Sequence, residues 1–172
     1  MSESVISVSE LTRRFGATTA LDNGKNGPRG GTQEEVMSRE QRKAQLKEAA
    51  TRYFDGLTKK DFDIIPYDDN VSLRAPFAPG GIHNPLVGRE KLRTLWWPPM
   101  PAILGEVRVF DLYYNDDLTA VVAEAEVEVT NPKARLRVAD RFTVNAAGKI
   151  VEQVNHSDPR DVTNPGWQKQ EA

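Results

Sequence analysis

The stretch "LRVADRFTVNAAGKIV", residues 136–151, decides the fold because it reads as a strand, a turn and the start of a second strand. Counted with a strand's period of two, one face carries Leu136 and Phe142, and the opposite face carries Arg137 and Arg141. Asp140 falls in the middle of the apolar face. An ionised carboxylate buried without a partner costs several kcal/mol. The sequence therefore predicts that Asp140 either has a partner or keeps its proton.

Neighbouring segments continue the strand pattern. "EVRVFDLYY" (106–114) and "LTAVVAEAEVEVT" (118–130) precede it, and "IVEQVNHS" (150–157) follows it, with turns at "NDD", "NPK" and "NAAGK". In the second of these segments, Val and Ala alternate with Glu124, Glu126 and Glu128. Such alternation is typical of an antiparallel sheet with one packed and one solvated face.

The first half of the domain predicts helices. Ser38 and Gln41 can form a capping box, and apolar residues from Leu46 to Leu57 follow at helical spacing. A short second helix is expected to begin at Thr58 and stop before Pro66. "NVSLRAP" (70–76) predicts a strand, "FAPGGIHNPLVG" (77–88) a loop, and "REKLRTLWW" (89–97) a third helix. Helices followed by an antiparallel sheet indicate the α+β class.

Composition restricts the range of functions. The 172 residues have a net charge of −2 and no Cys, which excludes disulfides and thiolate chemistry and gives no electrostatic reason to expect nucleic acid. No apolar run approaches the roughly 18 residues of a membrane helix, so we expect no membrane partner and a cytoplasmic location. We predict a flexible leader over 1–37, one domain over 38–157 and a polar C-terminal tail over 158–172.

Two segments carry a family resemblance. "RYFDGLTKKDFD" (52–63) and "DRFTVNAAGKIV" (140–151) resemble ketosteroid isomerase and the SnoaL-like polyketide cyclases, within the nuclear transport factor 2-like superfamily. The resemblance implies a cone-shaped fold, in which a strongly bent, mostly antiparallel sheet is wrapped by the three N-terminal helices around an apolar pocket. The superfamily hosts enzymes, binding modules and assembly domains, so the activity remains open.

The resemblance also implies roles for individual residues. The isomerase polarises a carbonyl with a Tyr on its first helix and a protonated Asp on a late strand, which match Tyr53 and Asp140. Its general base, an Asp before a Pro, is replaced here by Ala75. The alternatives are that Asp140 is a paired structural carboxylate and that Tyr53 is a core aromatic residue.

Two histidines are candidates for moving a proton. His83 lies in the Pro/Gly-rich loop, where it could cap the pocket or simply be solvated. Simple alternation from Ile150 points His156 inward, whereas the isomerase resemblance places Asn155 inward, and a bulge would decide between them. Both histidines and Asp140 lie on different elements, so the spacing does not support a metal site.

The sequence therefore predicts a pocket for a small apolar organic molecule, with no cofactor. If active, the protein is expected to be an isomerase, cyclase or dehydratase acting on a carbonyl or phenolic compound. The alternatives are non-catalytic binding of a hydrophobic ligand and a dimeric assembly domain, with a homodimer formed through the outer sheet face. The remaining pocket residues are expected to be Phe54, Tyr67, Leu73, Phe77, Trp96, Phe110 and Phe142.

Overall fold

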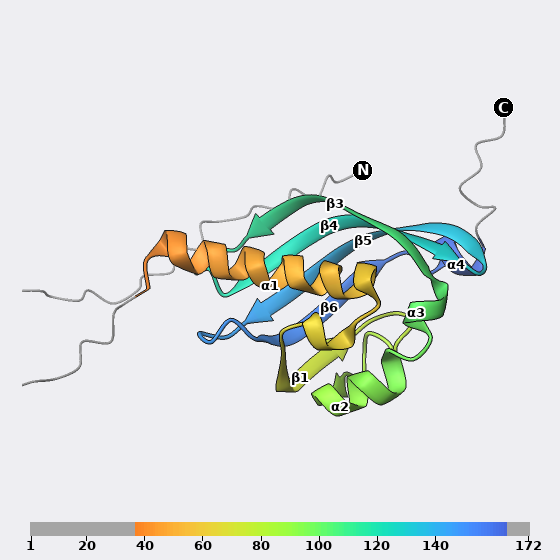
Figure 1. Cartoon of the computed structure of the whole chain (residues 1–172), viewed down its shortest axis with the longest axis horizontal. Coiled ribbons are helices and arrows are strands. Elements are labelled where there is room, and N and C mark those ends of the chain that lie inside the picture. The colour runs from red at the N-terminus through yellow and green to blue at the C-terminus, as the bar shows by residue number, and fades with distance from the viewer. Residues whose placement is uncertain (1–36, 165–172) are drawn as a thin grey trace, which may run out of the picture. The chain divides into compact units, whose positions relative to one another are not determined.

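Six strands form one curved, unclosed sheet in the computed structural model, which describes residues 37–164 (Figure 1). Their order is β2-β1-β6-β5-β4-β3, and only the β1–β6 pair is parallel. The strands are β1 (Tyr67–Arg74), β2 (Leu86–Val87), β3 (Leu104–Tyr114), β4 (Ala120–Thr130), β5 (Lys133–Val144) and β6 (Ile150–Ser157). The predicted α+β class and bent, mostly antiparallel sheet are confirmed.

Helix α1 (Arg39–Lys59) lies across the concave side of the sheet (Figure 1). The predicted capping box is present, because the Gln41 N–H donates to Ser38 Oγ at 3.2 Å and the Ser38 N–H donates to Gln41 Oε1 at 2.7 Å. The helix buries the side that contains Leu46, Tyr53 and Leu57. Its apolar spacing therefore acts as predicted, placing one stripe against the sheet.

The predicted short second helix is present before Pro66, but its predicted start at Thr58 is wrong. Thr58 stays inside α1, which ends where Lys60 adopts a left-handed conformation with φ of 57°. A 3₁₀ turn, η1 (Phe62–Ile64), follows with Asp61 as its N-cap. The chain can fold back here because Gly56 has no side chain: a Cβ at that position would lie 2.5 Å from Ile65 Cγ1. Because this contact is between residues nine positions apart, the sequence around Thr58 does not show that the helix continues past it.

The third predicted helix is divided. It begins as α2 (Arg89–Lys91) and continues as the π-helical segment η2 (Leu92–Trp96), in which the Trp97 N–H donates to the Leu92 carbonyl at 2.9 Å. The short helix α3 (Met100–Ile103) then leads into β3. The predicted leader lies outside the described residues except for Met37, and the predicted tail contains a short helix, α4 (Arg160–Thr163). No helix within residues 37–164 is both long and apolar enough to cross a membrane.

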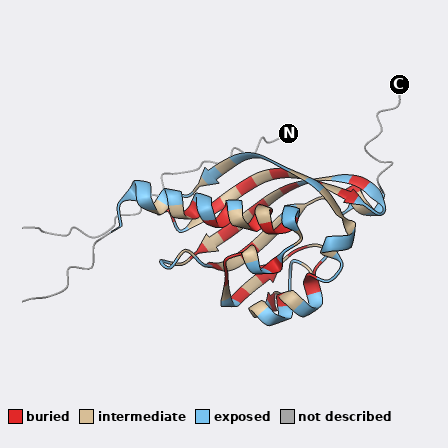
Figure 2. Cartoon of the chain, in the orientation of Figure 1, coloured by how far each residue is buried: buried red, intermediate tan, exposed pale blue. Residues whose placement is uncertain are grey.

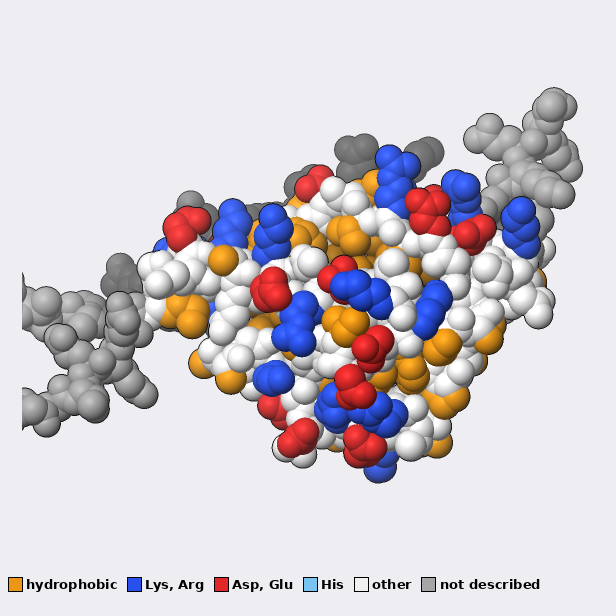
Figure 3. Space-filling model, in the orientation of Figure 1, with side chains coloured by type: hydrophobic (Ala, Val, Ile, Leu, Met, Phe, Trp, Pro, Cys, Tyr) orange, Lys and Arg blue, Asp and Glu red, His pale blue; other side chains and the backbone are white. Residues whose placement is uncertain are grey.

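Burial alternates along β4 and β5 (Figure 2). The outer face of these strands carries the predicted row of acidic and basic side chains, which pair within the chain: Arg135 with Glu126 at 3.3 Å and Arg137 with Glu124 at 2.5 Å. The predicted homodimer through this face stays a prediction. On the side seen in Figure 3, charges of both signs are interspersed, and apolar side chains reach the surface beside α3.

A bulge in β6 determines which of its residues face inward. Val144 is opposite Ile150 and Thr143 is opposite Glu152, so Val151 is an extra residue in the ladder. The residues after it therefore change sides relative to simple alternation. Gln153 is buried, whereas His156 is exposed and lies opposite Ala139 on the outer face. Of the two alternatives for His156, simple alternation is therefore wrong, and the inward position of Asn155 implied by the isomerase resemblance is the one found.

Candidate functional site

A cavity of about 260 Å³ lies between α1, the inner face of the sheet, and the segment from η2 to α3. Its wall is mostly apolar, with aliphatic side chains from β4 and β5 and aromatic or aliphatic ones from the η2–α3 segment. Val162 of α4 also lines it. The polar residues in the lining are Tyr53, Asn131, Asp140, Asn155 and Ser157. An apolar space with a few convergent polar groups is the usual form of a small-molecule site.

Asp140 enters this cavity from the inner face of β5, between Val138 and Phe142. Its side chain is 2% exposed. Among the described residues, its Oδ1 has no hydrogen-bond partner and no Arg or Lys forms an ion pair with it. Burial raises the pKa of Asp140 to about 8, because an ionised carboxylate would lose its hydration without gaining a partner. The carboxyl group therefore keeps its proton at neutral pH and can act as a hydrogen-bond donor.

Tyr53 reaches the same cavity from α1. It is 2% exposed, and its ring packs against Phe54 and Phe142 with centroid distances of 4.9 and 4.8 Å. Burial, with a further contribution from Asp140, raises the pKa of Tyr53. The hydroxyl therefore stays protonated, so two neutral O–H groups line one cavity.

Asn155 is the neighbour of Asp140 across the sheet. The two residues are directly opposite in the antiparallel β5–β6 ladder, so their side chains share the inner face. Asn155 Oδ1 accepts a hydrogen bond from Gln153 Nε2 at 2.7 Å, and Gln153 Oε1 accepts one from the Tyr67 hydroxyl at 2.5 Å. Simple alternation along β6 gives the wrong phase for Gln153 and Asn155 because of the bulge at Val151, and only the isomerase resemblance placed Asn155 inward.

The other predicted ligand-binding residues are found in three environments. Phe77, 46% exposed, and Trp96 line the cavity. Four lie in the buried core but not in the cavity lining: Phe54, Tyr67, Leu73 and Phe142. The prediction that Phe110 lines the cavity is wrong. The residue is 38% exposed, and the centre of its ring lies 4.0 Å from Cζ of Arg137. A second bulge in β3, between Val109 and Asp111, makes Phe110 the extra residue there.

Neither histidine reaches the cavity. His83 is exposed in a turn, where its carbonyl accepts a hydrogen bond from Arg74 Nη1 at 2.9 Å, and His156 is exposed on the outer sheet face. Ala75, which the sequence resemblance aligns with the isomerase base, lines the cavity. Within residues 37–164 no group of three or more His, Asp or Glu side chains could hold a metal ion.

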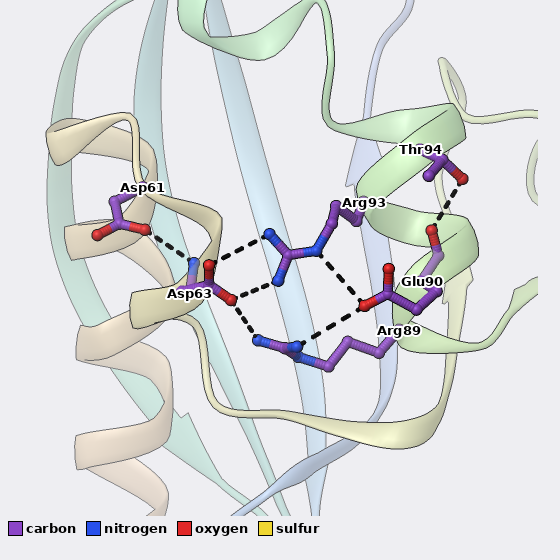
Figure 4. Close-up of polar contacts among 6 residues, drawn as sticks. All are labelled: Asp61, Asp63, Arg89, Glu90, Arg93 and Thr94. Carbon is purple, nitrogen blue, oxygen red and sulfur yellow. Dashed lines mark hydrogen bonds and ion pairs between the residues drawn. The ribbon is translucent and has the colours of Figure 1, made fainter.

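An ion-pair cluster holds the helical segment that carries Trp96 (Figure 4). The Asp63 carboxylate in η1 accepts hydrogen bonds from Arg89, at 2.7 Å, and from Arg93. The same two guanidinium groups lie over the Phe62 ring, at 5.4 and 4.6 Å. Hydrogen bonds from Arg93 and Arg89 lower the pKa of Asp63 to about 2. The cluster therefore fastens η2 to η1 beside one wall of the cavity.

Comparisons with known proteins agree with this architecture. Residues 50–153 match the SnoaL-like domain family. Similar solved structures include the epoxide hydrolase/cyclase-like enzyme SalBIII of pyran ring formation in salinomycin, with 20% identity, a TM-score of 0.58 and coverage of 69% of this chain and 95% of that one. A Mycobacterium tuberculosis epoxide hydrolase has 18% identity and a TM-score of 0.55, with coverage of 70% of this chain and 87% of that one. A Pseudomonas aeruginosa steroid delta-isomerase has 16% identity and a TM-score of 0.56, with coverage of 72% of this chain and 88% of that one. A comparison with curated protein sequences gave no match.

Proposed function

Because the chain belongs to the SnoaL-like domain family, we propose that its cavity binds a small, largely apolar compound that carries a carbonyl or phenolic oxygen. The observation that carries the proposal is Asp140, an acid without a hydrogen-bond partner at Oδ1, buried in an apolar cavity. A buried polar group without a partner is costly, and a ligand oxygen would satisfy it. The cavity volume of about 260 Å³ favours ligands of one or two rings.

Two donors in one apolar cavity suit an isomerase, cyclase or dehydratase. When negative charge develops on a carbonyl oxygen, the Tyr53 and Asp140 hydroxyl groups can stabilise it by hydrogen bonding in a mostly apolar site. A pKa of about 8 also lets Asp140 give up or regain its proton near neutral pH. This chemistry needs no cofactor, and Asp140 would be its principal residue.

Binding without turnover is the second candidate function. Ala75 supports it, because the residue at the isomerase's base position carries no ionisable group. The exposure of His83 and His156 supports it as well. The two candidates share the ligand class and differ in whether a proton is moved.

The pKa of Asp140 tests the proposal. It should be measured by carbon-detected NMR on the labelled protein, with Asp140→Asn identifying the signal. We expect a value near 8. A value at or below the ordinary figure of about 3.9 would mean a charged, structural carboxylate and would overturn the donor site.

Ligand binding gives a second, independent test. Acetophenone is suitable because its carbonyl oxygen accepts hydrogen bonds and does not titrate. Its affinity should be constant below pH 7 and should fall as the pH rises through about 8, because ionised Asp140 has no proton to donate. Asp140→Asn keeps a donor without a titrating group, so its affinity should not depend on pH. An affinity in the unaltered protein that is also independent of pH would contradict the proposal.

A further inference from the structure

We propose that Gln153 and Tyr67 fix the orientation of the Asn155 amide, so that Asn155 turns its NH₂ group to the cavity and the cavity favours ligands with an acceptor oxygen over ligands that offer only a donor. The inference rests on the proposed function and narrows its ligand class. None of these three positioning residues carries a charge.

The direction of these hydrogen bonds is set by the buried side chain of Tyr67. Tyr67 is 3% exposed, and a hydroxyl has a single proton to donate. Among the described residues, the acceptor that it meets is Gln153 Oε1 at 2.5 Å. Burial also raises the pKa of Tyr67 well above its ordinary value, so the hydroxyl remains a donor. Gln153 must therefore present its oxygen to Tyr67 and its amide nitrogen to the other side.

The next step transmits this direction toward the cavity. The side chain of Gln153 is fully buried, and its Nε2 donates to Asn155 Oδ1 at 2.7 Å. The Asn155 oxygen is thereby occupied, which leaves its NH₂ group as the part available to the cavity that Asn155 lines. Turning the Asn155 amide over would place two donors against each other, so its orientation is fixed by Gln153.

The last step adds the other donors of the cavity. The Tyr53 hydroxyl, the protonated Asp140 and the Asn155 amide then all present hydrogens to the cavity. A carbonyl or phenolate oxygen can accept from all three donors, whereas an amine N–H cannot pair with the NH₂ group of Asn155.

Three ligands of similar size test the inference. Acetophenone offers an acceptor, α-methylstyrene replaces that oxygen by CH₂, and N-methylaniline offers a donor. We expect the unaltered protein to bind acetophenone about tenfold more tightly than α-methylstyrene, and also more tightly than N-methylaniline. Affinities are measured by NMR titration of the full chain. Equal affinity for the acceptor and the donor ligand would overturn the inference.

Variants separate the relay from simple packing. Tyr67→Phe removes the hydroxyl that orients Gln153 and keeps the ring, so the preference for acetophenone over N-methylaniline should fall at least about threefold. Asn155→Ala should reduce it further. Tyr113→Phe is the matched control, because Tyr113 is 53% exposed on the outer sheet face, and it should leave the preference unchanged. Loosened packing would weaken all three ligands together and leave their ratios unchanged.

The outcomes distinguish the two proposals. If the unaltered protein binds none of the three ligands, the proposed function and this inference both fail. If Tyr53→Phe reduces the preference while Tyr67→Phe and Asn155→Ala leave it unchanged, the proposed function stands and the orientation of Asn155 by Gln153 and Tyr67 is refuted. Far-UV circular dichroism shows whether each variant is folded, and the ligand ratios of the unaltered protein test the inference without any variant.

Discussion

At the scale of single residues, the buried carboxyl of Asp140 makes stability depend on pH. Its pKa is about 8 in the folded protein and about 3.9 in an unfolded chain, so between these values the folded state holds one more proton than the unfolded state. Stability contributed by this group is therefore full below pH 4 and is lost as the pH rises to 8. Asp140→Asn removes this dependence. Between pH 4 and pH 7, the unaltered protein should lose about 4 kcal/mol relative to the variant.

Urea unfolding at pH 4, 6, 7 and 8 measures this difference. Asp116→Asn serves as the control, because Asp116 lies in an exposed turn and should follow the unaltered protein within about 0.5 kcal/mol at each pH. A constant difference between the unaltered protein and Asp140→Asn across the series would show that Asp140 is ionised in the folded state.

The sequence revealed Asp140 and concealed its neighbours for one physical reason. β5 pairs with β4 without interruption, so counting by two from Leu136 places Asp140 inside. β6 contains the extra residue Val151, which has ordinary strand character and no Gly or Pro to mark it. Every later position in β6 therefore falls on the face opposite to that given by simple alternation, as the isomerase resemblance implied for Asn155. Alternation alone could not identify the hydrogen-bonded pair Gln153–Asn155 as inward-facing.

At the scale of elements, the ion-pair cluster around Asp63 determines how firmly η2, which contains Trp96, is held against η1. Asp63→Asn removes the charge that both Arg89 and Arg93 contact, so the segment 92–97 should open more often. Amide hydrogen exchange in this segment should rise several-fold, with little change in global stability, since the ion pairs are exposed. Because the pKa of Asp63 is about 2, the cluster should persist to about pH 3.

Asp55→Asn is the matched control for this element. It breaks the exposed Asp55–Lys59 pair on α1, at 3.4 Å, and leaves the Asp63 cluster intact. Exchange in residues 92–97 should then match that of the unaltered protein. The anchoring role is refuted if Asp63→Asn also leaves this exchange unchanged.

Element boundaries were predictable where the determinant is local. The capping box at Ser38 and Gln41 lies within four residues of sequence and marks the start of α1 correctly. The end of α1 depends on Gly56 contacting Ile65, nine positions later, and was placed wrongly. The π-helical turn before Trp97 likewise has no signature in "REKLRTLWW", which is compatible with an ordinary helix.

At the scale of the whole molecule, the order of helices and strands was predictable and the cavity was only partly so. Turns such as "NAAGK" separate strands in which apolar and polar residues clearly alternate, and the family resemblance indicated how these strands are arranged in the sheet. The cavity depends on which side chains meet after the sheet bends. Met100 of α3 and Val162 of α4 line it from segments that carry no pocket signal in sequence. Such walls follow from packing between distant elements.

The same scale shows what this cavity lacks for isomerisation. In the proposed function, Tyr53 and Asp140 contact a carbonyl oxygen, but Ala75 stands where the resemblance aligns the base of the isomerase. Ala75→Asp would place a carboxylate on the cavity wall. We therefore expect Ala75→Asp to convert 3-cyclohexenone into its conjugated isomer about 10²-fold faster than the unaltered protein, as general-base catalysis typically provides. The change in ultraviolet absorbance of the product measures the rate.

Ala75→Asn is the decisive control, because Asn has nearly the shape of Asp and no basic oxygen at neutral pH. It should bind acetophenone and show no gain in rate. If Ala75→Asp binds acetophenone yet is no faster than Ala75→Asn, position 75 does not reach the carbon from which the proton must leave. The two donors would then serve binding alone, which is the second of the two functions that this cavity supports. A gain confined to Ala75→Asp would instead mean that the cavity holds the ketone in a reactive orientation and lacks only the base.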